Sequence, residues 1–460
     1  MEIKEEQRNQ QQQEKKLLFS ERALVALVIP LVIERFLDMV VGIADTAMVS
    51  SVGETAVSGL SLVDNISNLV IFVLAALATG GAVVISQYLG RDDRKNARIA
   101  AKQLLYTTFA FALVLAGICI GFCDGLLHLI FGELELEVMQ SASTYLLFIA
   151  ATFPFIAIFN SIAATFRSMG NSKMSLIISL GMNLLNIIGN AIFIYGFGWG
   201  VLGAGLSTLI SRVVASGVML YLIRDHRNAV FMTHILKIEL KPAMISSIMK
   251  IGIPSGLENG MFHLGRLIVY GIITSLGTAA IAANAVAGRI VAFTQVPGAA
   301  VSMAIVTVVG QCMGAGDYEQ AAYYTKKLMI KYTYIPSAIL CLIMFLFSNQ
   351  LLMLFNLSAE AVRMGTEVMQ LFCVVTAVIY PIAFPFANVL RSAGDAKFPM
   401  IVSIISMWVV RVGLSYVFHY AFDIGLQSIW LAMYADWLVR AVFFLLRYKS
   451  GKWKTMKVID

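Results

Sequence analysis

The sequence contains few charged side chains. Of its 460 residues only 13% are Asp, Glu, Lys or Arg, whereas 59% are hydrophobic, and the mean hydropathy is +0.81. A typical soluble domain carries about 25% charged residues, so a chain of this composition could not cover its surface in water. The scarcity of charge therefore excludes a soluble globular protein and predicts an integral membrane protein.

Histidine and cysteine are also scarce, with five of each. The histidines are scattered and form no His-Glu-x-x-His or similar metal motif. The cysteines lie in apolar runs, where cysteine behaves as a small hydrophobic residue. The sequence therefore predicts no metal site, no cofactor and no enzymatic activity. The cysteines are Cys119, Cys123, Cys312, Cys341 and Cys373.

Strand-like alternation and a secretory signal are absent as well. Residues 1–20 are rich in Gln, Glu and Lys and lack an apolar core, which predicts a polar cytoplasmic tail and no signal peptide. The absence of alternating segments argues against a porin-type barrel. At about 20 residues per span, the remaining apolar runs predict roughly twelve transmembrane helices. They are 21–50, 57–89, 96–123, 139–167, 174–196, 201–223, 243–275, 280–312, 318–347, 364–390, 398–420 and 425–447.

Basic residues gather at one end of the predicted helices. Of the 34 Lys and Arg residues, 27 lie in the terminal segments and in the loops after even-numbered helices, whereas the opposite loops contain only Arg363 beside several acids. Because cytoplasmic loops retain Lys and Arg, both termini are predicted to be cytoplasmic. The net charge of +7 then reflects topology in the cell membrane and does not indicate nucleic-acid binding.

The sequence repeats itself at an offset of 224 residues. The unit is six helices long, so both copies enter the membrane from the same side and form parallel repeats. The aligned pairs are Pro30 with Pro254, Glu34 with Glu258, Gly53 with Gly277, Gly90 with Gly314, Ala97 with Ala321, and Arg167, Ser168 and Gly170 with Arg391, Ser392 and Gly394.

The repeat predicts the domain organisation. Residues 21–225 form an N-lobe, 226–242 a cytoplasmic linker, 243–447 a C-lobe and 448–460 a basic cytoplasmic tail. Parallel repeats of this kind hold a substrate near the midplane between two lobes, which favours a transporter that works by alternating access. A duplication that only enlarged a helical bundle, and a channel, are the alternatives.

Twelve ionisable residues lie inside the predicted helices, where each is costly and points to function. Six acids and six arginines also permit complete ion pairing. That structural alternative applies above all to Asp436 and Arg440, which are four residues apart. The acids are Glu34, Asp38, Asp45, Asp64, Glu258 and Asp436, and the bases are Arg35, Arg212, Arg266, Arg289, Arg411 and Arg440.

Three of these acids lie on one face of the first helix. Glu34, Asp38 and Asp45 are spaced i, i+4 and i+11, which places them within about 40° of one another. Like charges on one stripe repel each other, so the stripe favours binding of protons or a cation. A helix-capping role for Asp45 is the alternative.

Polar residues that could face this stripe lie on the fifth and sixth helices. Asn183, Asn186 and Asn190 recur at i, i+3 and i+7, and Thr208 lies on a small-residue face. Amides inside a membrane need hydrogen-bond partners, and a carboxylate can supply them. Hydrogen bonding between helices without any ion site would also explain this pattern.

Six short motifs have the form found in one known transporter family. Together they span about residues 20 to 450 and resemble the multidrug and toxic compound extrusion (MATE) family, with the DinF-type branch as the most similar. They are Asp45-Thr46-Ala47-Met48, Gly90 at the end of the second helix, Arg167-Ser168-Met169-Gly170-Asn171, Leu185-Asn186-Ile187-Ile188, Gly203-Ala204-Gly205-Leu206-Ser207-Thr208, and Leu390-Arg391-Ser392 with Gly394.

The resemblance implies a fold and an activity. The fold is an all-α integral membrane bundle, V-shaped, with twelve transmembrane helices in two parallel six-helix repeats, as in the flippase-like (MOP) superfamily. The activity is antiport, in which organic cations and amphipathic toxic compounds are exported in exchange for H⁺ or Na⁺. The implied partners are small organic cations, amphipathic drugs and the lipid bilayer, and the protein is expected to be a monomer.

The resemblance also assigns roles to single residues of the N-lobe. Asp45 matches the family's aspartate in the N-lobe cavity, and Asn186 and Thr208 match its polar partners. Pro30 matches the proline at which the first helix bends, and Pro254 repeats it. Asn190 stands where many DinF-type members have a second aspartate, so a cation site built on two aspartates is weakened.

In the C-lobe the resemblance disfavours sodium. Glu258 matches a glutamate that another branch uses for Na⁺, with His263 nearby as a proton partner or a simple polar contact. The stretch Val378-Ile379-Tyr380-Pro381-Ile382 lacks the accompanying acid. We therefore expect H⁺ coupling through Asp45, in which protonation competes with the exported cation.

Aromatic residues at mid-helix positions are candidates for the substrate wall, although lipid contact or packing would explain each of them. A lipid-linked precursor flippase of the same superfamily is the alternative function, with Arg35, Arg266 and Arg289 as diphosphate ligands. An intramembrane enzyme is the alternative from another class. The candidate lining residues are Phe155, Phe159, Tyr270, Phe293, Tyr380 and Phe384.

Overall fold

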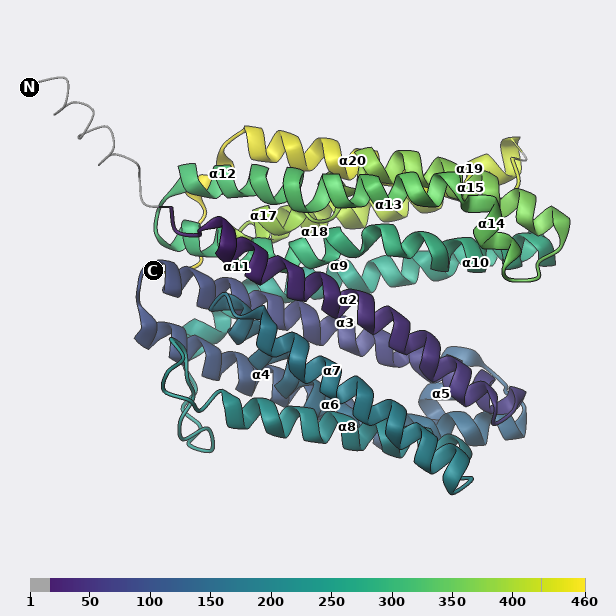
Figure 1. The fold of residues 1–460 in the computed structure, drawn as a ribbon, viewed down its shortest axis with the longest axis horizontal. Helices are drawn as coiled ribbons and strands as arrows, with labels where there is room; N and C mark the ends of the chain where they lie inside the picture. The colour runs from purple at the N-terminus through teal and green to yellow at the C-terminus, as the bar shows by residue number, and fades with distance from the viewer. Residues whose placement is uncertain (1–16, 423, 460) are drawn as a thin grey trace, which may run out of the picture.

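Helices are the only regular elements in residues 17–422 and 424–459, the part of the chain that the computed structural model describes (Figure 1). The first half, called the N-lobe, contains α2 (Glu21–Ser50), α3 (Glu54–Gly90), α4 (Arg94–Gly121), α5 (Cys123–Phe131), α6 (Leu136–Ser168), α7 (Ser172–Asn190), the π-helical η1 (Ala191–Gly196) and α8 (Gly200–Leu222).

The second half, called the C-lobe, contains more helix breaks. Its elements are α9 (Pro242–Ser275), α10 (Thr278–Val291), η2 (Ala292–Gln295), α11 (Val296–Gly314), α12 (Tyr318–Lys327), the π-helical η3 (Leu328–Tyr334), α13 (Ile335–Leu346), α14 (Ser348–Met353), α15 (Ala359–Val378), α16 (Tyr380–Ala383), α17 (Ala387–Ser392), α18 (Lys397–Ile405), the π-helical η4 (Ser406–Val412), α19 (Gly413–Phe422), α20 (Gln427–Lys449) and η5 (Lys452–Thr455).

Ten helical stretches of the described chain are long and apolar enough to cross a membrane. Outside that group, α2 and α9 are 30 and 34 residues long and contain several charged side chains. With them each lobe has six spanning helices, which confirms the predicted all-α membrane fold of twelve helices in two lobes. In Figure 1 the lobes meet at the end where α2 begins and α20 ends, here called the terminal end, and diverge toward the far end.

The 224-residue repeat is visible as local geometry. Gly53 and Gly277 each precede the second helix of their lobe with positive φ angles of 133° and 91°. Gly170 and Gly394 occupy matching turns with φ angles of 80° and 98°. Such angles favour glycine because a Cβ would clash with the backbone. The repeated glycines therefore mark turns that both copies of the unit require.

Repeated aspartates cap the third helix of each lobe. The Asp93 carboxylate accepts a hydrogen bond from the backbone N–H of Asn96 at 3.0 Å, and Asp317 accepts one from Gln320 at 3.0 Å. The backbone and side-chain hydrogen bonds from Asn96 hold the pKa of the Asp93 carboxyl below its usual range. Both caps satisfy N–H groups that a helix start leaves without partners.

Replacing Asp93 with alanine is expected to lower the stability by about 1 kcal/mol, because the cap is lost. The control is Asp93→Asn, which keeps an oxygen acceptor. The measurement is the melting temperature of the purified protein in detergent. Since the folded pKa is lowered, the carboxylate stabilises the fold above its unfolded pKa of about 4, and this contribution disappears as the pH falls through the folded pKa. Equal melting of Asp93→Ala and the natural protein at neutral pH would contradict the cap.

The first helix of each lobe packs its initial half against the other lobe. Leu27 and Leu31 of α2 are buried in one apolar cluster with Ala304 of α11. Ile248 of α9 is buried in a cluster with Val84 of α3. The two helices thus exchange their beginnings between the lobes, which the repeat alone does not predict, and this exchange joins the lobes at the terminal end.

Each exchanged helix contains a proline within its initial half. Pro30 has no N–H, so the usual helical bond to the Ala26 carbonyl cannot form. The Ser172 hydroxyl of α7 lies 3.2 Å from that carbonyl oxygen and 2.6 Å from that of Leu27. A neighbouring side chain therefore satisfies the interrupted backbone, as a membrane interior requires. Pro254 occupies the matching position of α9, and the hinge role of both prolines stays a prediction.

The C-terminal segment lies across the terminal end and packs on both lobes. Trp453 of η5 is 1% exposed, belongs to the cluster that contains α11, and stacks on Tyr448 with ring centroids 5.0 Å apart. Ile459 is 4% exposed, belongs to the cluster that contains α3, and its carbonyl accepts a hydrogen bond from Arg91 at 3.4 Å. The basic tail expected from the sequence is therefore a packed segment that bridges the lobes.

Candidate functional site

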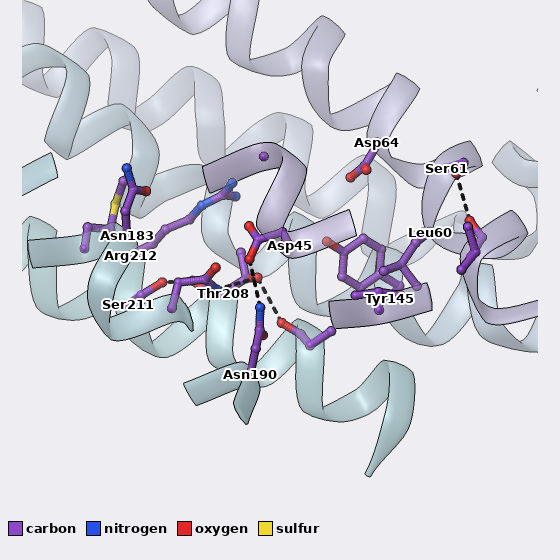
Figure 2. Close-up of a pocket in the computed structure, with 16 residues that line it drawn as sticks. Asp45, Leu60, Ser61, Asp64, Tyr145, Asn183, Asn190, Thr208, Ser211 and Arg212 are labelled. Atoms are coloured by element: carbon purple, nitrogen blue, oxygen red, sulfur yellow. Dashed lines mark hydrogen bonds between the residues drawn. The ribbon is translucent and has the colours of Figure 1, made fainter. Parts of the chain in front are cut away.

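A polar cavity of about 230 Å³ lies in the N-lobe among α2, α3, α6, α7 and α8 (Figure 2). Its wall combines carboxylates, side-chain amides, hydroxyls and one guanidinium. The lining residues are Gly42, Asp45, Val49, Val57, Leu60, Ser61, Asp64, Tyr145, Met182, Asn183, Asn186, Asn190, Ala204, Thr208, Ser211 and Arg212.

Asp45 lies in this N-lobe cavity with amide groups of α7 around its carboxylate. The Asn190 amide nitrogen donates to one carboxylate oxygen at 2.9 Å. The Asn186 side-chain amide has one orientation in which all of its hydrogen bonds are satisfied. In that orientation its nitrogen donates to both carboxylate oxygens of Asp45, at 2.9 and 3.1 Å, and its oxygen accepts a hydrogen bond from the Thr208 hydroxyl at 3.2 Å. The structure thus brings Asp45 together with three of the polar residues predicted to face it, Asn186, Asn190 and Thr208, and their role in ion coupling stays a prediction.

Asp64, Tyr145 and Arg212 face the same cavity (Figure 2). Asp64 and Arg212 lie close enough to Asp45 to act on its charge, and Arg212 also donates a hydrogen bond to Thr152 at 2.6 Å. Two carboxylates and one guanidinium give the cavity a negative charge when both acids are ionised. Spacing along one helix could not reveal this group because its members lie on α3, α6 and α8, although a charge inside an apolar segment marks Asp64 and Arg212.

Glu34 and its repeat counterpart Glu258 are bonded elsewhere. Glu258 forms an ion pair with Arg391. Glu34 accepts hydrogen bonds from the Ser175 hydroxyl at 2.9 and 3.0 Å, and that hydroxyl accepts one from Arg167 at 3.2 Å. Arg167 and Arg391 are counterparts in the repeat, so the two buried glutamates occupy equivalent polar sites. Neither glutamate lines the N-lobe cavity.

Asp38 and His263 also have partners outside the N-lobe cavity. The Asp38 carboxylate lies 3.5 Å from the Arg35 guanidinium. His263 stacks on Phe72 of α3, with ring centroids 4.5 Å apart. The imidazole therefore faces an aromatic ring of the other lobe, while Glu258, its suggested proton partner, is bound to an arginine. Of the predicted acidic stripe on α2, only Asp45 reaches the cavity.

A second cavity of about 850 Å³ lies in the C-lobe. Met39, Gly42 and Ile43 of α2 border it, so Gly42 lies at both cavities. Phe155 and Phe159 line neither cavity, because a mid-helix position does not specify which face of a helix looks inward. The four other predicted lining residues do belong to the C-lobe cavity, and they are Tyr270, Phe293, Tyr380 and Phe384.

The remaining buried charges include one predicted ion pair. The Arg440 Nε lies 2.8 Å from the Asp436 carboxylate. Both side chains are buried, which confirms the structural alternative for this pair. Four of the five cysteines are buried and Cys123 is half-buried. The described residues contain no group of three or more His, Cys, Asp and Glu side chains placed to hold a metal ion.

Comparisons with known proteins agree with the duplicated architecture. The MatE family pattern matches residues 30–192 and again residues 254–417, two segments that begin 224 residues apart. The uncharacterized transporter YisQ of Bacillus subtilis is 30% identical over 444 residues, 94% of each chain. The probable multidrug resistance protein NorM of Thermotoga maritima is 29% identical over 448 residues, 95% of this chain and 94% of that protein. A solved structure described as the outward-facing conformation of a multidrug resistance MATE family transporter of the MOP superfamily superposes with a TM-score of 0.87 at 22% identity, and the match covers 94% of this chain and 96% of that one.

Proposed function

Since the chain belongs to the MATE family of membrane transporters, we propose that it is a secondary antiporter that exports organic cations and amphipathic drugs in exchange for protons. The observation that carries this proposal is the Asp45 carboxylate inside a cavity of about 230 Å³, held by the Asn186 and Asn190 amides. Ionised Asp45 attracts a cation, whereas protonated Asp45 does not. One carboxylate can therefore bind substrate and proton in turn.

The exchange follows from this competition. A proton that enters from outside the cell neutralises Asp45, so the bound cation loses its counter-charge and leaves, while the amides around Asp45 change their hydrogen bonds. A ligand shifts an equilibrium between two lobe arrangements only by its differential affinity for them. The proton must therefore bind more tightly to the arrangement that has released the cation, and Pro30 offers α2 a place to bend between them.

The residue types favour protons over sodium. Asn190 places a neutral amide in hydrogen-bond contact with Asp45, and a carboxylate at that position would strengthen the binding of a hard cation. In the C-lobe, the Glu258 carboxylate forms an ion pair with Arg391, so it is already neutralised by a protein cation. The motifs of the chain resemble the DinF-type branch most, which supports placing the protein in that branch.

The proposed setting is the cell membrane, with both chain ends in the cytoplasm and the protein acting as a monomer. The positive charge of the terminal segments and of the loops on their side supports this orientation. In that orientation the lobes are in contact at the cytoplasmic side, and both cavities border the second half of α2, away from that contact.

The test is transport of a fluorescent organic cation into vesicles with a pH gradient and a sodium gradient imposed separately. We expect the pH gradient to drive accumulation of the dye. Transport driven by sodium alone would overturn the proton coupling, and transport driven by neither gradient, in vesicles shown to contain folded protein, would overturn the antiporter. Vesicles without the protein are the control.

The flippase alternative has less support. Arg35 lies 3.5 Å from the Asp38 carboxylate and does not line the C-lobe cavity, whereas Arg266 and Arg289 do. The three arginines therefore do not form a single diphosphate site. The N-lobe cavity also has the sign that attracts cations.

A further inference from the structure

The C-lobe cavity has the opposite electrical character from the N-lobe cavity. Three arginines line it, Arg266 of α9, Arg289 of α10 and Arg411 of η4, and none of its lining residues is Asp or Glu. In the described part of the chain neither Arg266 nor Arg289 forms an ion pair within 4 Å. The cavity therefore presents positive charge that its own wall does not neutralise.

Arg411 shows this imbalance most clearly. Its side chain is buried, with 7% of the residue exposed, and its Nε has no hydrogen-bond partner among the described residues. Asp436 is near enough to act on its charge, but that carboxylate is already in contact with Arg440. The Asp436 carboxylate is thus the counter-charge for both Arg411 and Arg440. A buried arginine without full compensation is costly, and an arginine inside a membrane span is by default a sign of function.

The backbone around Arg411 is also irregular. The residue belongs to the π-helical segment η4, which interrupts the α-helical path between α18 and α19. Single π-helical turns in α-helices occur frequently at functional sites, where they change the direction of side chains. The irregularity is therefore consistent with a specific placement of this guanidinium at the cavity.

Aromatic rings form the rest of the wall. Phe372 lies edge-on to Trp430 and Trp437 with centroid distances of 5.4 and 5.7 Å, and Phe384 is 5.4 Å from Trp437. The Trp437 indole N–H is buried and has no hydrogen-bond partner in the described chain. Such walls offer flat apolar surfaces with a few polar groups, which suits a planar organic ligand.

We propose that the C-lobe cavity is a binding site for amphipathic organic anions, molecules with a flat aromatic body and a carboxylate, sulfonate or phosphate group. The anionic group accepts hydrogen bonds from the lining arginines, whose planar guanidiniums match such groups, and the body packs against Trp430 and Trp437. The volume of about 850 Å³ suits a drug-sized molecule, because such pockets measure about 300 to 1,000 Å³.

This site goes beyond the exchange of cations for protons and does not require Asp45. The phosphate of a lipid headgroup has the same anionic chemistry, but it is attached to acyl chains, and the aromatic wall favours a ring system. Because Gly42 of α2 borders both cavities, an anion in the C-lobe and a cation in the N-lobe would approach the same helix from two sides.

Calorimetric titration of the purified protein in a neutral detergent tests the site with three ligands of one shape. Naphthalene-2-sulfonate is negative, naphthalene-2-sulfonamide is neutral and 2-naphthyltrimethylammonium is positive. We expect the sulfonate to bind at least about 10-fold more tightly than the sulfonamide, since a hydrogen bond to a charged group contributes about 1.5 to 3 kcal/mol. Equal affinities for sulfonate and sulfonamide would overturn the proposal.

Two variants locate the binding. Arg266→Gln and Arg289→Gln are each expected to weaken sulfonate binding about 10-fold, because both guanidiniums line the cavity and have no ion pair that their removal would break. The matched control is Arg363→Gln on α15, whose exposed guanidinium lies 3.4 Å from Glu367 and does not line the cavity. Unchanged sulfonate affinity in both cavity variants would sink the assignment. Asp45→Asn is expected to bind the sulfonate as tightly as the natural protein. The anion site can therefore be confirmed or rejected independently of the antiport proposal.

A lipid arm distinguishes the two sources of the anion. The sulfonate titration is repeated in phosphatidylcholine nanodiscs with and without phosphatidylglycerol, for the natural protein and for Arg266→Gln. A phosphatidylglycerol effect seen only in the natural protein identifies a lipid phosphate as the competing occupant. An equal effect in both proteins reflects surface charge and leaves a soluble aromatic anion as the ligand.

Discussion

Asp45→Asn is expected to abolish proton-driven efflux of an organic cation while the protein still folds. The asparagine has nearly the same shape, and its side-chain oxygen can accept the hydrogen bond that Asn190 donates at 2.9 Å. It carries no charge and takes up no proton in the physiological range. Both halves of the proposed exchange therefore fail at one residue, and we expect the rate driven by a pH gradient to fall at least about 10-fold, in line with the loss of a charge-assisted contact.

The measurement is dye transport in vesicles with an imposed pH gradient, compared at equal amounts of reconstituted protein. The matched control is Asp124→Asn, an exposed carboxylate of α5 whose partner is the Ser143 hydroxyl at 2.7 Å, and it should transport normally. Undiminished exchange in Asp45→Asn would sink the assignment of Asp45 as the coupling residue.

Asp64→Asn, which removes the second carboxylate of the cavity, is expected to weaken cation binding with a smaller effect on the pH dependence of transport.

The spanning helices and the two-lobe repeat could be predicted because both leave a signal in the order of residues along the chain. Apolar runs of spanning length predict helices wherever lipid replaces water, since only internal hydrogen bonds can satisfy the backbone there. The constant offset of 224 residues predicts that Gly53 and Gly277 share one geometry, and both have positive φ angles. Neither inference needs knowledge of how the helices pack.

The exchange of α2 and α9 between the lobes could not be predicted in this way. Leu27 is equally apolar whether it packs on α11 or on a helix of its own lobe. The hydrophobic effect depends on the area removed from water and not on the identity of the neighbour. Only the full packing decides which helix covers which face, so the sequence assigns α2 to the N-lobe while its first half belongs to the interface.

The site was predictable along one helix and not across helices. Asp45, Asn186 and Asn190 were found by spacing, because regular intervals place side chains on one face. Tyr145 and Arg212 come from α6 and α8 and meet Asp45 only through tertiary packing. The same limit explains Glu34, which has the right spacing on α2 but lies beside Ser175 instead of the cavity.

The contact between the lobes at the terminal end leads to a second large effect. Gly90 ends α3 and Gly314 ends α11, and each faces a backbone carbonyl of the other lobe. A Cβ on Gly90 would lie 2.0 Å from the Gln311 carbonyl oxygen, and a Cβ on Gly314 would lie 1.9 Å from that of Gln87. Because the obstacle is backbone in both cases, no side-chain rotation relieves the overlap.

Side-chain amides complete this contact with the same symmetry. The Gln87 amide donates to the Ser392 carbonyl at 2.8 Å, and the Gln311 amide donates to the Ser168 carbonyl at 2.7 Å. The four residues are pairwise counterparts at the 224-residue offset. The terminal end is thus held closed by two copies of one interaction. If the protein works by the proposed alternating access, an opening at this end has to break both copies.

Gly90→Ala is therefore expected to force the lobes apart at the terminal end and to stop transport. Overpacking typically costs about 1 to 3 kcal/mol, which shifts a two-state equilibrium by about 5- to 150-fold toward the arrangement without this contact. The control is Gly117→Ala, a helical glycine of α4 with no atom within 4 Å of the added Cβ. The readout beside transport is maleimide labelling of Ser86→Cys in a chain whose five native cysteines are replaced, because Ser86 is buried against Gly310 at this contact. Faster labelling in Gly90→Ala, with a melting temperature close to that of the control, supports the closed contact as one state of the transport cycle. Unchanged labelling together with normal transport would show that the arrangement of the lobes does not depend on this contact.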